Sequence, residues 1–458
     1  MKDDFITTLM KDVDDILESP IEMQEANQPI LIFEGIFIIK DETGEIELDG
    51  KIQYNWSPNT GVIFYGKAIK VSKEIMKIVN EIEYFDVIAN NENLGKGIIS
   101  NFEINSEIII KGVFQYKVIT GDKSIPVDKL KFCIPNFRDF LGLAVKKITK
   151  TNQGSYKNRI ILDNEKYSII IDKCVDYKNL YNSVNENGGY IILYSGELKT
   201  KKGALTFENS KEIMYCLNVF LSFLNAKRTS ALFVHGIYNE ETIWCDYSNY
   251  NVDRYDSLPS WTNSNSIENL NELWQVFSKK WNNKNDKDVL NTAVHWYLQC
   301  NKNSGYVEGS LIMAQTALEL LYNWYIVENK KLLLGKDSEN INAANKIRLL
   351  VSQLNINYSV PKKFSSLQIF LKSEKLLDAP EAVVQIRNAI VHSQEEKRTR
   401  LSNIDNNAKY QALQLCIWYI EMVLLKTLDF NGIYCNRCSE NMSISAKREY
   451  VPWYHKTI

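Results

Sequence analysis

The spacing of apolar residues changes once along this chain, and that change limits its fold more than any other feature. From Gln28 to about Thr200, short apolar and alternating runs rich in Ile, Val, Tyr and Phe are broken by turn residues. Such runs are typical of β-strands. Beyond Ser266 strand signals disappear, and apolar residues recur at helical spacing over long segments. The sequence therefore predicts an α+β multidomain chain, with a β-rich half followed by an all-α half.

The β-rich half is expected to form a sandwich-like domain over residues 1–207, completed by a helix and further strands over 208–257. The apolar period becomes helical near Ser210 and stays so to Ala226, and alternation then returns. A polar stretch at 258–266, which contains Pro259, is the predicted linker. The expected strands are 30–39, 46–54, 61–71, 97–102, 107–116, 159–162, 167–171, 189–195, 230–236 and 242–245.

Long helical patterns in the second half predict a bundle over 267–430, followed by a C-terminal tail over 431–458. The last pattern, at 406–428, carries too many apolar residues for a surface helix. We therefore expect this helix to be central or to lie at a subunit contact. The predicted helices are 267–281, 286–300, 307–328, 340–353, 380–392 and 406–428.

Composition and cysteine usage indicate a cytoplasmic protein. The first fifteen residues are charged and no apolar run follows them, so we expect no secretory signal. The longest apolar stretches fall far short of the roughly 20 residues of a membrane helix, so no membrane association is expected. Eight scattered cysteines suit a reducing compartment. Cys435 and Cys438 have metal-like spacing but lack a second pair, with His455 as the one other nearby candidate, so we expect neither metal nor cofactor.

The net charge of −2 hides an asymmetry. Residues 342–400 contain 10 Lys and Arg against 5 Asp and Glu, which leaves 44 against 51 for the remainder. The excess positive charge of this segment indicates either a solvated helical surface or a patch that faces phosphate groups.

Within this basic segment lies Arg387-Asn388-Ala-Ile-Val-His392. Asn388 and His392 are four residues apart and share a helix face, and Arg387 can join them through its long side chain. An imidazole with a pKa of about 6.5 can donate and accept protons at neutral pH, and a guanidinium can hold a phosphate. RNA carries its own nucleophile, the 2′-hydroxyl, so such a cluster suits metal-free RNA cleavage.

One helix supplies only one histidine, whereas the reaction uses a proton acceptor and a proton donor. A twofold homodimer would bring two copies of the cluster together. The structural alternative is that His392 and Asn388 fix a helix end while Arg387 pairs with an acid such as Glu319. Glu319 could also orient Arg387 or His392, and His295, in an apolar helical pattern, is predicted to be a core histidine.

An all-helical C-terminal domain whose late helix carries Arg-Asn-x-x-x-His resembles the HEPN superfamily, in which this motif marks metal-independent RNases that work as dimers. The wider layout is similar to large HEPN proteins of the ApeA kind, which act in abortive phage defence. The catalytic roles carry over only to Arg387, Asn388 and His392. The segments that carry the wider likeness are Leu221-Ser-Phe-Leu224, Phe233-Val-His-Gly236, Ala314-Gln-Thr-Ala-Leu-Glu-Leu320 and Val451-Pro-Trp453.

The resemblance implies a homodimeric endoribonuclease that cuts cellular RNA, with tRNA as a candidate, in an anti-phage response. The β-rich half would then sense a trigger, such as a phage-derived protein, or restrain the activity. Two alternatives stay open. One is a non-catalytic HEPN module that binds RNA or a protein, and the other is a carbohydrate or small-ligand binding protein that uses the β-rich half.

Overall fold

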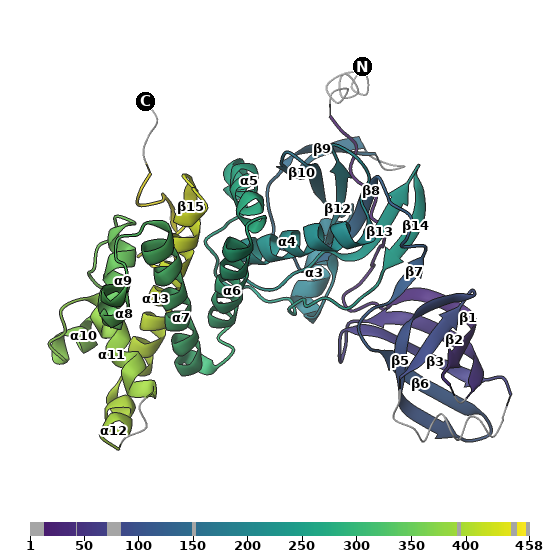
Figure 1. Ribbon diagram of the computed structural model, residues 1–458, viewed down its shortest axis with the longest axis horizontal. Helices are drawn as coiled ribbons and strands as arrows, with labels where there is room; N and C mark the ends of the chain where they lie inside the picture. Colours follow the sequence, from purple (N-terminus) through teal and green to yellow (C-terminus); the bar gives the residue numbers. More distant parts are fainter. Residues whose placement is uncertain are drawn as a thin grey trace. The chain divides into compact units, whose positions relative to one another are not determined.

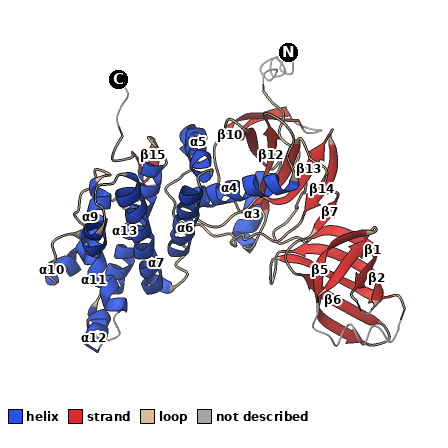
Figure 2. Ribbon diagram, in the orientation of Figure 1, coloured by secondary structure: helices blue, strands red, loops and turns tan. Residues whose placement is uncertain are grey.

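The computed structural model describes residues 13–42, 44–70, 84–148, 153–391, 395–440 and 447–454. The chain divides into two compact units. The first comprises Met1–Phe137, Leu141–Asn218 and Thr229–Asp256, and the second Arg138–Phe140, Val219–Arg228 and Ser257–Ile458. Strands dominate the first unit and helices the second (Figure 2). The predicted α+β organisation, with the β-rich half first, is confirmed.

The first six strands close into an antiparallel barrel with the order β1-β2-β3-β6-β5-β4 (Figure 1). The barrel is closed where β1 pairs with β4, with Phe37 opposite Ala89. Its interior is filled by large side chains such as Phe64, and a Cβ at Gly112 would lie 2.1 Å from the Phe64 ring. The strands are β1 (Ile30–Lys40), β2 (Glu45–Asn55), β3 (Gly61–Ala68), β4 (Phe85–Ala89), β5 (Glu92–Ile104) and β6 (Ile108–Phe114).

This closed barrel differs from the sandwich-like arrangement that the strand pattern suggested. Alternating apolar residues indicate only that one face of a strand is buried, and both a sandwich and a barrel satisfy that condition. The pairing between β1 and β4 decides between them, and β4 was not among the predicted strands.

Eight further strands form one sheet with the order β7-β14-β13-β8-β12-β11-β10-β9. The central strands β8 and β12 are buried on both faces, so they lack the alternation that identifies a half-exposed strand. Helix α4 (Phe207–Asn225) confirms the helix expected near Ser210, and α3 (Tyr177–Asn187) was not predicted. The strands are β7 (Ile119–Gly121), β8 (Lys129–Pro135), β9 (Leu143–Ile148), β10 (Gln153–Asp163), β11 (Tyr167–Lys173), β12 (Ile192–Thr200), β13 (Leu232–Tyr238) and β14 (Glu241–Asp246).

The second unit is helical and is organised around α13 (Asn406–Thr427), which packs against α6, α7, α10 and α11. Sixteen of its 22 residues are buried, which confirms the central position expected from its apolar surface. The other elements are η1 (Ser266–Asn269), α5 (Leu270–Trp281), α6 (Lys284–Asn301), α7 (Tyr306–Tyr322), the π-helix η2 (Asn323–Asn329), α8 (Lys336–Asn340), α9 (Ala343–Ser352), α10 (Ser365–Ser373), α11 (Ala379–Val391), α12 (Glu395–Asn403), β15 (Ile433–Cys435) and β16 (Arg448–Tyr450).

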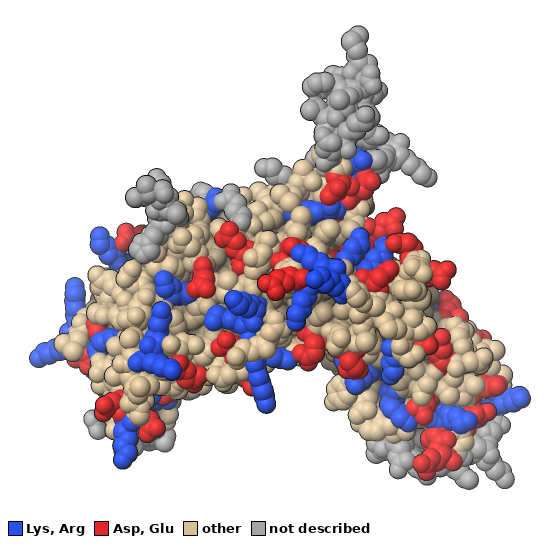
Figure 3. Space-filling model, turned by 45° about the horizontal axis from the view of Figure 1, so that its top comes forward, with Lys and Arg blue, Asp and Glu red and all other residues tan. Residues whose placement is uncertain are grey.

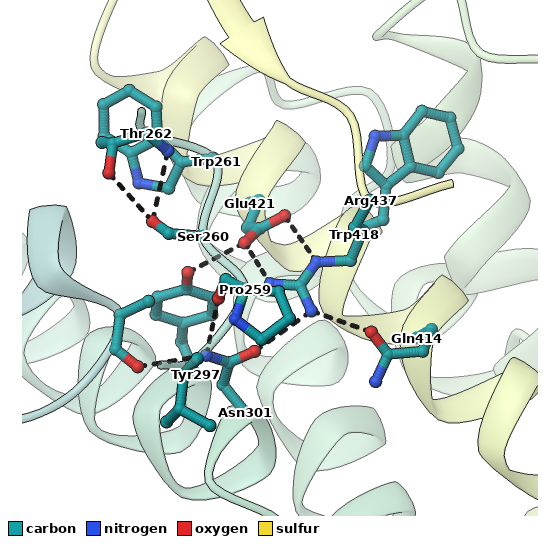
Figure 4. Close-up of polar contacts among 12 residues, drawn as sticks. Pro259, Ser260, Trp261, Thr262, Tyr297, Asn301, Gln414, Trp418, Glu421 and Arg437 are labelled. Carbon is teal, nitrogen blue, oxygen red and sulfur yellow. Dashed lines mark hydrogen bonds and ion pairs between the residues drawn. The ribbon is translucent and has the colours of Figure 1, made fainter. Parts of the chain in front are cut away.

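A buried ion pair joins the C-terminal segment to α13 (Figure 4). The Arg437 guanidinium donates from Nε to Glu421 Oε2 at 2.9 Å and from Nη2 to Oε1, and the Glu421 side chain is fully buried. Tyr297 Oη donates to Glu421 Oε1 at 2.8 Å. Burial, and then the Glu421 carboxylate, raise the pKa of Tyr297, so its hydroxyl keeps the proton that it donates.

The third guanidinium nitrogen of Arg437, Nη1, binds side chains of α6 and α13. This nitrogen donates to Asn301 Oδ1 at 3.0 Å and to Gln414 Oε1 at 3.1 Å. Asn301 Nδ2 in turn donates to the Pro259 carbonyl at 2.9 Å, and Trp261, two residues beyond, is completely buried. Segment 258–266 is thus packed into the helical unit by the same network (Figure 4).

The Glu421–Arg437 pair generates a stability prediction. Glu421→Gln leaves the Arg437 charge buried without a counter-ion and should lower the free energy of unfolding by about 3–5 kcal/mol, whereas replacing both residues by Met should cost much less. Urea denaturation followed by the helical circular dichroism signal measures both.

Glu319→Gln is the matched control, because its carboxylate is largely exposed and pairs with Lys346 at the surface. We expect a change of about 1 kcal/mol or less for this variant. An equally small loss for Glu421→Gln would contradict the structural role assigned to the buried pair.

Candidate functional site

Helix α11 (Ala379–Val391) carries Arg387 and Asn388 and is fixed at its start by Asp378. Asp378 Oδ1 accepts from the backbone N–H of Glu381 at 3.0 Å, the geometry of an N-terminal cap. The same carboxylate binds Arg348 of α9, with Nε to Oδ2 at 2.6 Å and Nη2 to Oδ1 at 2.9 Å. Pro380 lies in the first turn, as predicted.

The sequence carried a signal for this cap that our sequence analysis did not use. Asp378-Ala-Pro-Glu381 has the spacing of a capping box, an acceptor side chain followed three residues later by Glu. Glu381 Oε2 accepts from the backbone N–H of Leu377 at 2.8 Å, so it fixes the chain just before the helix. The start of α11 is therefore well defined.

The inner face of α11, where Ala382, Val383 and Ile386 are completely buried, packs against α7, α9 and α13. Gln315 of α7 adds a polar contact, because its Nε2 donates to the Val383 carbonyl at 2.9 Å. These contacts set the rotation of the helix about its axis. Arg387 and Asn388 consequently lie on its half-exposed side.

The Arg387 guanidinium makes one weak contact in the described structure. Its Nη1 lies 3.4 Å from Asn388 Oδ1, and its buried Nε has no hydrogen-bond partner. Among the residues that the structure describes, no carboxylate pairs with Arg387. Glu319, the proposed acid partner, instead accepts from Lys346 Nζ at 2.5 Å. The pairing of Arg387 with Glu319 is therefore wrong.

His392 lies outside the described residues, as does the stretch up to residue 394. The structure therefore brings Arg387 and Asn388 together, and the position of His392 in this cluster stays a prediction. Val391, the last residue of α11, is 41% exposed.

Of the four histidines, His235 and His295 lie in the described parts of the chain. His295 was predicted to be a core residue, but it lies exposed on α6 with its Nδ1 2.8 Å from Arg228 Nη2. That prediction is wrong. Burial, with a smaller effect of Lys131, lowers the pKa of His235 to about 4, so it is uncharged at neutral pH.

The basic segment 342–400 is partly neutralised within the protein. Lys346 binds Glu319, Arg348 binds Asp378, and Lys363 Nζ donates to the Arg437 carbonyl at 3.1 Å. On the face drawn in Figure 3, basic side chains are interspersed with acidic ones rather than gathered into one continuous patch. Among the described residues, Arg387 differs from Lys346 and Arg348 in that no carboxylate pairs with it.

Cys435 and Cys438 are free thiols, and burial raises the pKa of Cys438. In the described ranges, no group of three or more His, Cys, Asp or Glu side chains could hold a metal ion. His455, the third ligand considered for these cysteines, lies beyond those ranges. A search of the described helices for a membrane-spanning segment found none long and apolar enough.

Comparisons with known proteins cover most of the chain. Residues 122–258, which contain the large sheet except for β7, match the model of the YopA central domain, and residues 283–448, which contain α11, match that of the YopA C-terminal domain. A Bacillus subtilis (strain 168) protein described as "SPbeta prophage-derived uncharacterized protein YopA" is 27% identical over 448 residues, which are 95% of this chain and 98% of that protein. No solved structure matches. The chain is therefore similar to YopA over nearly its whole length.

Proposed function

We propose that the chain is a metal-independent endoribonuclease of the HEPN type that works as a homodimer, with Arg387, Asn388 and His392 as its catalytic residues. The observation that supports this proposal best is that the Arg387 guanidinium lacks a carboxylate partner among the described residues. This side chain is half-buried on a well-fixed helix and lies beside the Asn388 amide. A buried or half-buried charge is normally paired, so an unpaired one favours an anionic ligand such as phosphate.

In the proposed reaction each residue has one task. Arg387 donates hydrogen bonds to the non-bridging phosphate oxygens, whose negative charge grows as the 2′-hydroxyl attacks. His392 of one subunit takes the proton of that hydroxyl, and the corresponding histidine of the other subunit gives a proton to the leaving 5′-oxygen. Asn388 orients the phosphate or the imidazole. The P–O5′ bond breaks as the bond to the 2′-oxygen forms, which leaves a 2′,3′-cyclic phosphate.

The setting we propose is phage-related growth arrest, with tRNA or another structured cellular RNA as the target. The Bacillus subtilis relative is described as derived from the SPbeta prophage, and this supports a role in conflict among phages or between phage and host. An unrestrained ribonuclease would poison its own cell. We therefore assign sensing or restraint to the β-rich unit, with a phage-derived protein as a candidate trigger.

The catalytic assignment predicts the outcome of an RNA cleavage assay in EDTA. Full-length protein should cut 5′-labelled RNA, and His392→Ala and Arg387→Ala should each lower the rate about 100-fold or more, because each removes a transition-state interaction. A substrate with a 2′-deoxynucleotide at the cut position should be resistant, since it lacks the nucleophile.

Two variants serve as controls for this assay. Lys372→Ala removes one positive charge from an exposed position on α10 and should cut at the rate of the unaltered protein. Arg387→Lys keeps the charge but loses the paired donors, and should stay impaired. Equal cleavage by His392→Ala would reject the site, whereas RNA binding that depends on Arg387 without any cleavage would favour the non-catalytic module.

The composite site also predicts an oligomeric state. Because each chain supplies one histidine, size-exclusion chromatography with light scattering should give twice the 53.0 kDa chain mass at micromolar concentration. An active monomer would contradict the two-histidine mechanism.

A further inference from the structure

The β-rich unit contains a cavity of about 260 Å³ between helix α4 and strands β13 and β14. This volume lies just below the ~300–1,000 Å³ range of ligand pockets, so any ligand is small. One wall is the start of α4, with Phe207 and Met214, and the other is formed by Trp244 and Asp246 of β14. None of these residues takes part in the proposed ribonuclease site.

Asp246 is the unusual residue of this cavity, because it is an acidic residue that is only 4% exposed. Oδ1 accepts from the backbone N–H of Ser248 at 2.9 Å, and Oδ2 accepts from the Tyr250 hydroxyl at 3.0 Å. Burial, and then the Asp246 charge, raise the pKa of Tyr250, so this hydroxyl remains a donor. Within the described part of the chain, no Lys, Arg or His forms an ion pair with Asp246. A buried carboxylate usually has such a partner.

The walls beside Asp246 are aromatic. Phe207 and Trp244 contact edge to face with ring centroids 4.9 Å apart. The indole is held directly over Gly236, where a Cβ would lie 2.2 Å from it. Aromatic faces attract cations through the negative potential of the ring.

Further acidic side chains line the cavity beside the buried Asp246 carboxylate. Glu208 and Glu212 line the cavity together with Asp246, and Lys211 is the one basic residue among the lining side chains. Lys211 Nζ is already bound to Glu208 at 3.0 Å, and it lies 5.5 Å from the Phe207 ring centroid. The lining side chains thus include three carboxylates and one lysine, and that lysine pairs with Glu208 rather than with Asp246.

We propose that this cavity binds a small organic cation, an amine or guanidinium compound whose charge pairs with Asp246 and whose carbon skeleton contacts Phe207 and Trp244. Such a ligand supplies the counter-ion that Asp246 lacks and displaces water from the aromatic walls. The small volume of the cavity favours a free metabolite over the side chain of a protein partner.

Isothermal titration calorimetry of the full-length protein tests this proposal. The probes are putrescine, agmatine and choline, with 1,4-butanediol as a neutral analogue of putrescine. At least one cation should bind and the diol should not. Asp246→Asn should weaken that binding about tenfold or more, because a hydrogen bond to a charged group is lost. Glu241→Gln, an exposed carboxylate on the same strand outside the cavity, should bind like the unaltered protein.

A second variant keeps the test decisive if Asp246→Asn fails to fold. Glu212→Gln alters an exposed rim carboxylate and should weaken binding of the same cation about two- to threefold, with a smaller dependence on salt. The proposal would be overturned if none of the three cations bound at millimolar concentration, or if the diol bound as tightly as putrescine. It would also be overturned if Asp246→Asn were unfolded and Glu212→Gln bound the cation with unchanged affinity. Tighter binding of acetyl-Gly-Arg-Gly-amide than of agmatine would overturn the metabolite as the source of the cation.

Discussion

The architecture of the helical unit depends on the buried pair between Glu421 and Arg437. Two charges removed from water are costly to bury, and only the complete set of partners offsets that cost. Tyr297 and Asn301 of α6 and Gln414 of α13 supply these partners. Every residue of this network must be in place for the pair to be stable. The network therefore forms one rigid scaffold from α13, α6, segment 258–266 and the C-terminal segment.

That scaffold determines what α11 presents to solvent. Helix α13 packs against α7 and α11, and Asp378 and Gln315 fix the start and the rotation of α11. The position of Arg387 follows from these contacts rather than from any interaction of its own charged group. A guanidinium without a carboxylate partner among the described residues would, in the proposed function, bind an anion without first breaking an ion pair there.

The two candidate sites share one physical feature, a charged group whose expected partner is missing from the described structure. Most ionic side chains in the interior are satisfied, as with Arg159 and Asp172 or Arg348 and Asp378. Arg387 and Asp246 are exceptions of opposite sign, one on a helix of the second unit and one beside a cavity of the first. The first favours an anionic ligand and the second a cationic one.

The sequence by itself determined the order of a β-rich and a helical half, the interior position of α13 and the adjacency of Arg387 and Asn388 on one helix. These features follow from the spacing of neighbouring residues, which local backbone geometry converts directly into structure. Only the tertiary structure decided the closure of the barrel, the burial of segment 258–266 and the partner of Glu319. It also decided the partners of Arg437, which lie as far as 136 positions away along the chain. Periodicity identifies which side chains are buried, but the choice among distant partners depends on the packing of the whole unit.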